Sequence, residues 1–249
     1  MDRMDYLLRD SHHLGVAYGK FDHFRLIDTL RILPTPASAG AGIAAEPTLG
    51  VEEGGIHSAA ALLLARYFMY TQVYFHPIRR IYDLHLKDFL AAHLPNGKFS
   101  TDLESHLEMT DNEVTTAIHQ AARDGKHPGH DPAMRIAGHR HFKTLYQRNP
   151  EDVAKNPEAG KAVHDAAVAK FGAETVRWDR YTQKGEATVF PVLMKDGRIV
   201  SSVEISETIQ RLPLVSVDFV FIEPEKSKEA EKWLKDNRTD LIQTAKEVP

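Results

Sequence analysis

The feature that most constrains the fold is an apolar stretch at residues 56–76, IHSAAALLLARYFMYTQVYFH. It has about the 20 residues that a membrane-spanning helix needs. Arg66 and Gln72 lie inside it and His57 lies near its start, at positions that lipid would penalise. We therefore predict a buried helix at the centre of a helical domain. Pro77 is expected to begin the next helix, because proline is favoured in the first helical turn.

Further helices are predicted on both sides of this stretch. The first helix is expected to end near Gly15, and the apolar spacing of residues 21–33 predicts a second helix, which Pro34 stops. Residues 34–55 are rich in Pro, Gly and small side chains, which predicts a loop and leaves short strands open. The helix that ends at Pro95 is expected to be followed by several shorter ones.

Local capping signals predict where the later helices begin. Thr110 and Glu113 have the spacing of a capping box, which predicts a helix that ends before Gly125. The pairs Asp131-Pro132 and Asn156-Pro157 are each expected to supply a helix cap and a first-turn proline, the second for a helix that ends at Gly172.

The hydrophobic periodicity changes after Gly172. ETVRWD, ATVFPVLM, RIVSSVEIS and LVSVDFVFIE predict strands, with a hairpin at Lys195-Asp196-Gly197. SETIQRL and SKEAEKWLKDN predict helices. The fold class predicted is therefore mainly α, a helical body over residues 1–150 followed by a small α+β lobe over residues 151–249.

Composition excludes several partners. The 249 residues carry a formal net charge of −4, and basic residues do not cluster with aromatic ones, so we expect neither nucleic-acid nor membrane binding. The chain has no cysteine and no visible signal peptide, which fits a cytoplasmic location. A metal would have to be bound by His, Asp or Glu.

A histidine-rich segment is one candidate for such a metal site. It contains the adjacent pair His130-Asp131 together with His127, His139 and His141. His130-Asp131 lies between Pro-Gly and Pro, so we interpret the segment as an exposed turn and helix start rather than a metal site.

The opening helix is the stronger candidate. At about 100° per residue, one narrow polar arc contains Asp2, Tyr6, Arg9, Asp10 and His13. A plain solvent-facing side is the alternative interpretation. As a functional face, the helix would offer a metal-ligating carboxylate at Asp2 and a guanidinium for phosphate at Arg3. Tyr6 would stack on a sugar, and Asp10 would accept a hydrogen bond from a sugar hydroxyl.

The run MDRMDYLLRDSHHLGV resembles the segment that carries the last metal-ligating aspartate of HD-domain phosphohydrolases of the dNTP triphosphohydrolase type. This family includes the SAM-and-HD-domain triphosphohydrolases and bacterial dGTPase-like proteins. The resemblance continues through FDHFRLIDTLRI, ARYFMYTQVYFHPIRRIYD and STDLESHLEMTDNEV into FPVLMKDGRIVSSVEISE. It implies a helical HD-type domain and metal-dependent hydrolysis of deoxynucleoside triphosphates into deoxynucleoside and triphosphate.

The same resemblance implies roles for individual residues. Asp2 becomes the fourth ligand of a divalent metal (Mg, Mn, Zn or Fe), Arg3 a phosphate contact, Tyr6 the tyrosine on the deoxyribose and Asp10 the reader of its hydroxyl. Tyr82 is implied in the nucleotide pocket, with core packing as an equal alternative. Arg140 and Lys143 are implied in binding an effector nucleotide.

The sequence departs from the family pattern in its metal ligands. The first His and the adjacent His-Asp pair of the family lie upstream of the segment that begins here with Asp2. Because a metal needs three or four protein ligands, we expect a C-terminal portion that is weakly active or inactive by itself, with an exposed apolar surface. It would form a homo-oligomer or pair with a longer chain. The alternative is a non-catalytic nucleotide-binding or oligomerisation module.

Overall fold

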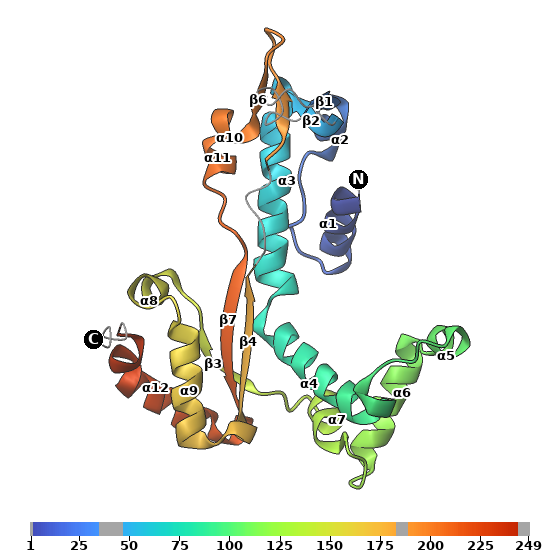
Figure 1. Ribbon diagram of the computed structural model, residues 1–249, viewed down its shortest axis with the longest axis vertical. Coiled ribbons are helices and arrows are strands. Elements are labelled where there is room, and N and C mark those ends of the chain that lie inside the picture. Colours follow the sequence, from blue (N-terminus) through green and yellow to red (C-terminus); the bar gives the residue numbers. More distant parts are fainter. Residues whose placement is uncertain (1, 35–46, 183–188, 244–249) are drawn as a thin grey trace. The chain divides into compact units, whose positions relative to one another are not determined.

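The computed structural model describes residues 2–34, 47–182 and 189–243, and the chain divides into two compact units (Figure 1). Unit 1 comprises residues 1–75 and 182–216, and unit 2 comprises residues 76–181 and 217–249. Helices dominate and the sheets are small, which confirms the predicted fold class. The division of the sequence at residue 150 stays a prediction.

Unit 1 is built around one long helix. Helix α3 is apolar on most sides, and its buried residues include Ala59, Leu63 and Met69. Within the described ranges, no helix has the length and apolar character that crossing a membrane requires. The helical elements of unit 1 are α1 (Asp2–His13), α2 (His23–Thr29), η2 (Glu53–Gly55), α3 (Ile56–Met69), the π-helix η3 (Tyr70–Tyr74), α10 (Ser202–Ile205) and α11 (Glu207–Gln210).

The sheet of unit 1 has the strand order β1-β2-β5-β6. Strand β2 is antiparallel to β1 and parallel to β5, and β6 returns antiparallel to β5. Its strands are β1 (Leu30–Pro34), β2 (Pro47–Glu52), β5 (Pro191–Leu193) and β6 (Ile199–Ser201). The core beneath it joins Met4 of α1, Leu63 of α3 and Val192 of β5.

Two sequence predictions in unit 1 are wrong at their ends. The helix expected through residue 33 stops at Thr29, because residues 30–34 pair with β2. Sheet pairing with a distant segment outweighs helical spacing here. The strand RIVSSVEIS ends at Ser201, where α10 follows, although the hairpin turn is confirmed with Gly197 at φ +84°. Of the expected loop, residues 35–46 lie outside the described residues and 47–52 form β2.

Unit 2 contains the remaining helices and a second sheet, ordered β3-β7-β4. Strand β3 is antiparallel to β7, and helices α9 and α12 contribute Val163 and Leu234 to the core that covers it. Its main elements are α4 (Pro77–His93), α5 (Leu103–Glu108), α6 (Asp111–Arg123), α7 (His130–Ala137), β3 (Lys143–Gln147), α8 (Pro150–Lys155), α9 (Ala159–Phe171), β4 (Val176–Thr182), β7 (Ser216–Ile222) and α12 (Ser227–Ile242).

Capping in unit 2 follows the predictions in part. The capping box of Thr110 and Glu113 is present at α6. Helix α7 begins at His130, two residues before the predicted first-turn Pro132, and Asp131 does not cap it but accepts a hydrogen bond from Nε of Arg135 at 2.8 Å.

Helix α9 also has a different cap from the one predicted. Asn156 accepts a hydrogen bond from the backbone N–H of Glu158, and the helix itself begins at Ala159. The combination of cap and first-turn proline occurs instead at α8, where Asn149 accepts from the N–H of Asp152 at 2.9 Å.

A buried ion pair fastens α4 to the sheet of unit 2. Nε and Nη2 of Arg80 donate to the two carboxylate oxygens of Asp179 in β4, at 2.6 and 2.5 Å. The Asp179 side chain is only 6% exposed. This fork-to-fork geometry assigns Arg80 a structural role within unit 2.

Candidate functional site

Helix α1 divides its side chains between a core face and a polar face. Met4, Leu7 and Ser11 are buried, as expected for residues three and four apart. Tyr6 and Asp10 are half-buried beside that face, whereas Asp2 and Arg3 are exposed. The helix therefore presents its polar groups from the edge of its contact with α3.

Tyr74 holds the carboxylate of Asp10. Its hydroxyl donates to Oδ2 of Asp10 at 2.7 Å. Burial and the neighbouring carboxylate raise the pKa of Tyr74 above its usual value. Tyr74 thus remains a hydrogen-bond donor at neutral pH, and it fixes one oxygen of Asp10.

A cluster of three tyrosines surrounds this bond. Tyr74 contacts Tyr6 of α1 and Tyr70 of the π-helix edge-on, with ring centroids 6.3 and 5.1 Å away. Burial raises the pKa of Tyr6 above its usual value, the neighbouring Tyr70 raises it further, and the guanidinium of Arg66 opposes both. Single π-helical turns within α-helices are frequent at functional sites.

Arg66 of α3 has an unusual environment. Its guanidinium carbon lies 5.1 Å from the centroid of the Tyr70 ring, within the range of a cation–π contact. Its Nε is buried and has no hydrogen-bond acceptor among the described residues. A buried donor without an acceptor costs about 1–3 kcal/mol, so this arginine is not fully satisfied by the protein that surrounds it.

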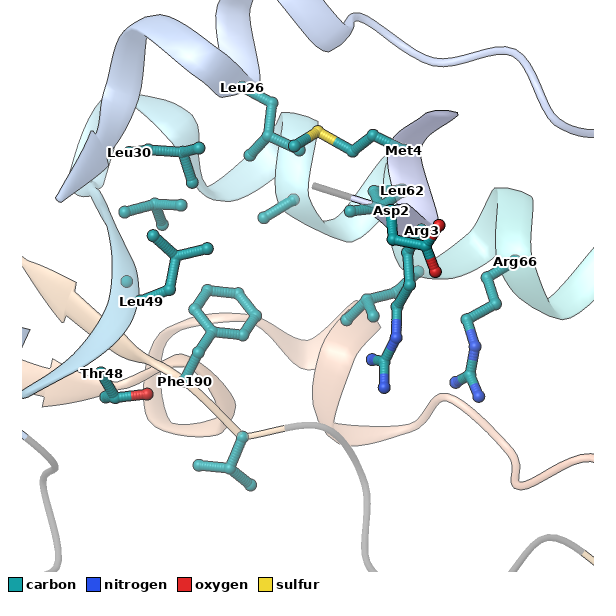
Figure 2. Close-up of a pocket in the computed structure, with 15 residues that line it drawn as sticks. Asp2, Arg3, Met4, Leu26, Leu30, Thr48, Leu49, Leu62, Arg66 and Phe190 are labelled. Carbon is teal, nitrogen blue, oxygen red and sulfur yellow. The ribbon is translucent and has the colours of Figure 1, made fainter. Parts of the chain in front are cut away.

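Arg66 shares a cavity of about 490 Å³ with Asp2 and Arg3 (Figure 2). Figure 2 shows the side chains of Arg3 and Arg66 extending in the same direction from α1 and α3. The rest of the wall is mainly apolar. It includes Leu26, Leu30, Leu49, Leu62 and Phe190.

The described residues do not form a metal site. Across residues 2–34, 47–182 and 189–243, no three His, Asp or Glu side chains lie close enough together to hold a metal ion. The cavity offers one carboxylate, Asp2, together with two guanidinium groups, Arg3 and Arg66, which repel cations. Asp2 can supply one ligand to a metal whose other ligands come from elsewhere.

The histidines of the candidate cluster have other contacts. Nε2 of His127 lies 3.3 Å from Nδ1 of His93, and Nδ1 of His130 lies 2.9 Å from the carbonyl oxygen of Ala121. His139 has a φ of +54°. These arrangements are local contacts of α4, α6 and α7.

The other predicted site residues lie in unit 2. The hydroxyl of Tyr82 is 3.3 Å from Nδ1 of His139 and its ring packs on His141, while burial raises its pKa. Arg140 forms an ion pair with Glu225 at 2.5 Å. Lys143 lines a cavity of about 210 Å³ with His141 and Thr144. The predicted roles of Tyr82, Arg140 and Lys143 stay predictions.

Three residues beside α1 were not predicted as site residues: Arg66 of α3, and Tyr70 and Tyr74 of η3. In the sequence, Arg66 argues only against a membrane-spanning helix. Their spacing of i, i+4 and i+8 is nevertheless a polar stripe on an otherwise apolar helix. That stripe was the signal available in the sequence.

Comparisons with known proteins identify relatives of part of the chain. The family model for the HD associated region matches residues 21–177. The uncharacterized protein MJ1154 of Methanocaldococcus jannaschii is 45% identical over 86 residues, which are 34% of this chain and 17% of that protein. The uncharacterized protein YwfO of Bacillus subtilis is 37% identical over 89 residues, which are 36% of this chain and 18% of that protein.

Solved structures match more of the chain. A hypothetical protein from Aquifex aeolicus is 31% identical and gives a TM-score of 0.75. The match covers 94% of this chain and 56% of the Aquifex chain. The phosphohydrolase BT4208 from Bacteroides thetaiotaomicron is 20% identical and gives a TM-score of 0.62. The match covers 89% of this chain and 60% of the BT4208 chain, and at this identity it shows a shared fold alone. The chain thus spans less than two thirds of each of these relatives, and its family match extends over more than half of its own length. It belongs to the family of HD-associated regions.

Proposed function

We propose that this chain is part of a metal-dependent phosphohydrolase of deoxynucleoside triphosphates, of the dGTPase or dNTPase type. The observation that carries the proposal is the order of groups along α1. Arg3 lines the cavity beside Asp2, and Tyr6 and Asp10 follow one and two turns later against the tyrosine cluster. Membership of the HD-associated-region family and the fold shared with a phosphohydrolase support it.

Each side chain has a proposed role in binding. Arg3 contacts phosphate, since a guanidinium matches phosphate oxygens in pairs. Tyr6 packs on the deoxyribose. Asp10 accepts a hydrogen bond from the sugar hydroxyl with the oxygen that Tyr74 does not occupy, and the Tyr74 bond keeps that carboxylate in place.

The proposed metal would be bound jointly by Asp2 and by residues of another segment. Asp2 provides one ligand, and a His and an adjacent His-Asp pair from a segment outside the described residues would provide the others. Such a metal lowers the pKa of its bound water and neutralises phosphate charge. Because the described residues supply one ligand only, we propose that the chain by itself binds the substrate but hydrolyses it weakly or not at all.

The test of hydrolysis uses the full chain with dGTP and Mn²⁺ or Mg²⁺, and it measures release of triphosphate and deoxyguanosine. We expect little or no turnover. Robust turnover that Asp2→Ala abolishes would contradict the proposed incapacity and support Asp2 as a ligand.

The test of binding uses calorimetric titration of dGTP and of dideoxy-GTP, which lacks the 3′ hydroxyl. Asp10→Asn should weaken dGTP about tenfold or more, the usual worth of a charged hydrogen bond, and leave dideoxy-GTP unchanged. Asp5→Asn, an exposed carboxylate on the same helix, is the matched control. An equal loss for both nucleotides would refute the role of Asp10.

A non-catalytic nucleotide-binding or oligomerisation module is the second candidate, and the single carboxylate in the cavity favours it. Phe24 and Ile32 are also 73% and 70% exposed in unit 1, which suits contact with another copy or a longer partner. Both candidates predict dNTP binding with little turnover, but only the first makes Asp2 a ligand of the substrate's metal. Saturable dNTP binding in the presence of metal that Asp2→Ala leaves unchanged would therefore favour this module. Light scattering would measure the mass of the assembly.

We also propose that Lys143 and Arg140 contact an effector nucleotide. Arg140 would have to exchange its bond with Glu225 for the phosphate. Lys143→Gln should then weaken binding of a second nucleotide equivalent without affecting the first. Unchanged stoichiometry and affinity would remove Lys143 from consideration.

A further inference from the structure

Residues 95–113 of unit 2 are exposed at every position. Helix α5 lies within this segment and buries none of its six residues. Local hydrogen bonds hold it in place. The carboxylate of Asp102 accepts from the backbone N–H of Ser105 at 3.0 Å, and the capping box of Thr110 and Glu113 begins α6 after it. The conformation of the segment is therefore set by its caps rather than by burial of its side chains.

Several exposed side chains of this segment are apolar. Phe99, Leu103, Leu107 and Met109 are 47%, 70%, 68% and 37% exposed. Leu103 and Leu107 are four residues apart on α5, so they share one face of the helix. The next helix, α6, does bury its apolar side chains, since Ile118 packs in a core with residues of α4 and α7. Apolar groups that gather on one exposed face in this way are typical of a surface that binds a partner.

The same segment is strongly acidic. Residues 99–113 contain five carboxylates and no lysine or arginine. The backbone N–H of Ser105 lowers the pKa of Asp102, and the hydroxyl of Thr110 lowers the pKa of Glu113, so both are ionised at neutral pH. No described lysine or arginine forms an ion pair with any of the five. The carboxylates are Asp102, Glu104, Glu108, Asp111 and Glu113.

This charge determines which partners fit the segment. Nucleic acids and anionic membranes carry charge of the same sign and are repelled. Two copies of the segment that meet face to face would also bring like charges together, which disfavours a symmetric contact between copies. A fitting partner presents apolar side chains flanked by lysine or arginine.

We propose that residues 99–113, here called the α5 surface, bind a basic amphipathic helix of a partner protein. The apolar face of that helix covers the leucines of α5, and its lysine or arginine side chains pair with the carboxylates around them. An amphipathic helix repeats its apolar residues every three or four positions, which suits the four-residue spacing of Phe99, Leu103 and Leu107. The α5 surface shares no residue with the proposed nucleotide contacts, so the inference does not depend on the proposed function.

The experiment measures binding of two labelled model peptides to the full chain by fluorescence anisotropy. Both are amphipathic helices of about 14 residues, or about four turns. One consists of leucine and lysine, and the other of leucine and glutamate. We expect saturable binding of the leucine–lysine peptide and none of the leucine–glutamate peptide. The affinity should fall as salt is added, because salt screens exposed charges.

Two double variants separate the apolar from the charged part of the α5 surface. Leu103→Ser with Leu107→Ser should weaken binding of the leucine–lysine peptide about tenfold or more, because both side chains would otherwise bury apolar area against it. Glu104→Gln with Glu108→Gln should weaken binding several-fold and reduce its dependence on salt.

The matched controls remove the same kinds of group elsewhere. Phe24→Ser with Ile32→Ser changes two apolar side chains of unit 1 that are as exposed as the leucines of α5. Glu229→Gln with Glu231→Gln changes two exposed carboxylates of α12. Both control variants should bind the leucine–lysine peptide as the unsubstituted chain does. Thermal melting by circular dichroism establishes that each variant is folded.

Several results would overturn the inference. They are failure of the leucine–lysine peptide to bind, equal affinity for the two peptides, and equal affinity of the leucine double variant and the unsubstituted chain. Light scattering that shows an assembly of the chain alone, dissociated by the leucine substitutions, would assign the surface to a second copy instead. If the leucine double variant melts early, the glutamate double variant decides, and unchanged peptide binding there overturns the inference. None of these results bears on dGTP binding, which tests the proposed function separately.

Discussion

The stability of unit 2 should depend on the protonation of His85. This side chain of α4 is 2% exposed, and its Nε2 faces the backbone N–H of Phe142 at 3.4 Å. Burial, reinforced by the cations Arg135 and Arg177, lowers the pKa of His85 to about 4. The native state therefore keeps this imidazole neutral, while the unfolded chain protonates it near pH 6.5.

The direction and the size of this pH effect on the free energy of unfolding follow from proton linkage. Above pH 6.5 both states hold His85 neutral and the folded state has its full stability. As the pH falls from 6.5 to 4 only the unfolded state gains the proton, so the free energy of unfolding falls. At 1.36 kcal/mol per pKa unit the complete loss is about 3 kcal/mol, of which about 2 kcal/mol is reached at pH 5.

Urea unfolding followed by tryptophan fluorescence is the assay, because Trp178 and Trp233 both lie in unit 2. Between pH 7 and pH 5 the midpoint should fall by about 1 M more in the unsubstituted chain than in His85→Gln, given a slope of about 1–3 kcal/mol per M. Gln keeps an acceptor for Phe142 but does not titrate. The exposed His119→Gln should behave as the unsubstituted chain does. Parallel pH profiles for His85→Gln and the unsubstituted chain would refute the argument.

Three further outcomes are expected. Tyr74→Phe should weaken dGTP binding several-fold by titration, because it releases the carboxylate of Asp10, and it should weaken dideoxy-GTP less; an equal effect on both would contradict this. Arg80→Ala should lower the free energy of unfolding of unit 2 by about 3–5 kcal/mol, since it leaves a buried carboxylate unpaired; a loss below 1 kcal/mol in urea would show that water replaces the pair. Gly160→Ala should cost about 1–3 kcal/mol, because a Cβ there would lie 2.2 Å from a carboxylate oxygen of Asp218; an unchanged melting temperature would mean that Asp218 moves away freely.

The elements predicted correctly are those that local interactions determine. The capping box at Thr110, the start of α4 at Pro77 and the Asp-Gly turn at Gly197 each depend on residues within four positions. Strand β1 depends instead on pairing between Leu30 and Val51, about twenty residues away. Helical spacing in residues 30–33 carried no information about that partner, so the prediction failed there.

The candidate site also combines features set by local sequence with features set by contacts between distant segments. The polar groups of α1 could be predicted because one helix presents them at a known angular spacing. The hydrogen bond from Tyr74 to Asp10 could not be predicted, because it depends on how α1 packs against the residues that follow α3. The sequence offered the stripe of Arg66, Tyr70 and Tyr74, but a stripe does not say which element it faces.

Arg66 links the constraint on the fold to the chemistry of the site. In a buried helix an arginine is tolerated only where its guanidinium reaches a polar or aromatic neighbour. In α3 those neighbours are Tyr6 and Tyr70, and beyond them lies the cavity that Arg3 also lines. The residue that argues most directly against a membrane span in the sequence is thus also one that lines the cavity beside Asp2 and contacts the tyrosine cluster.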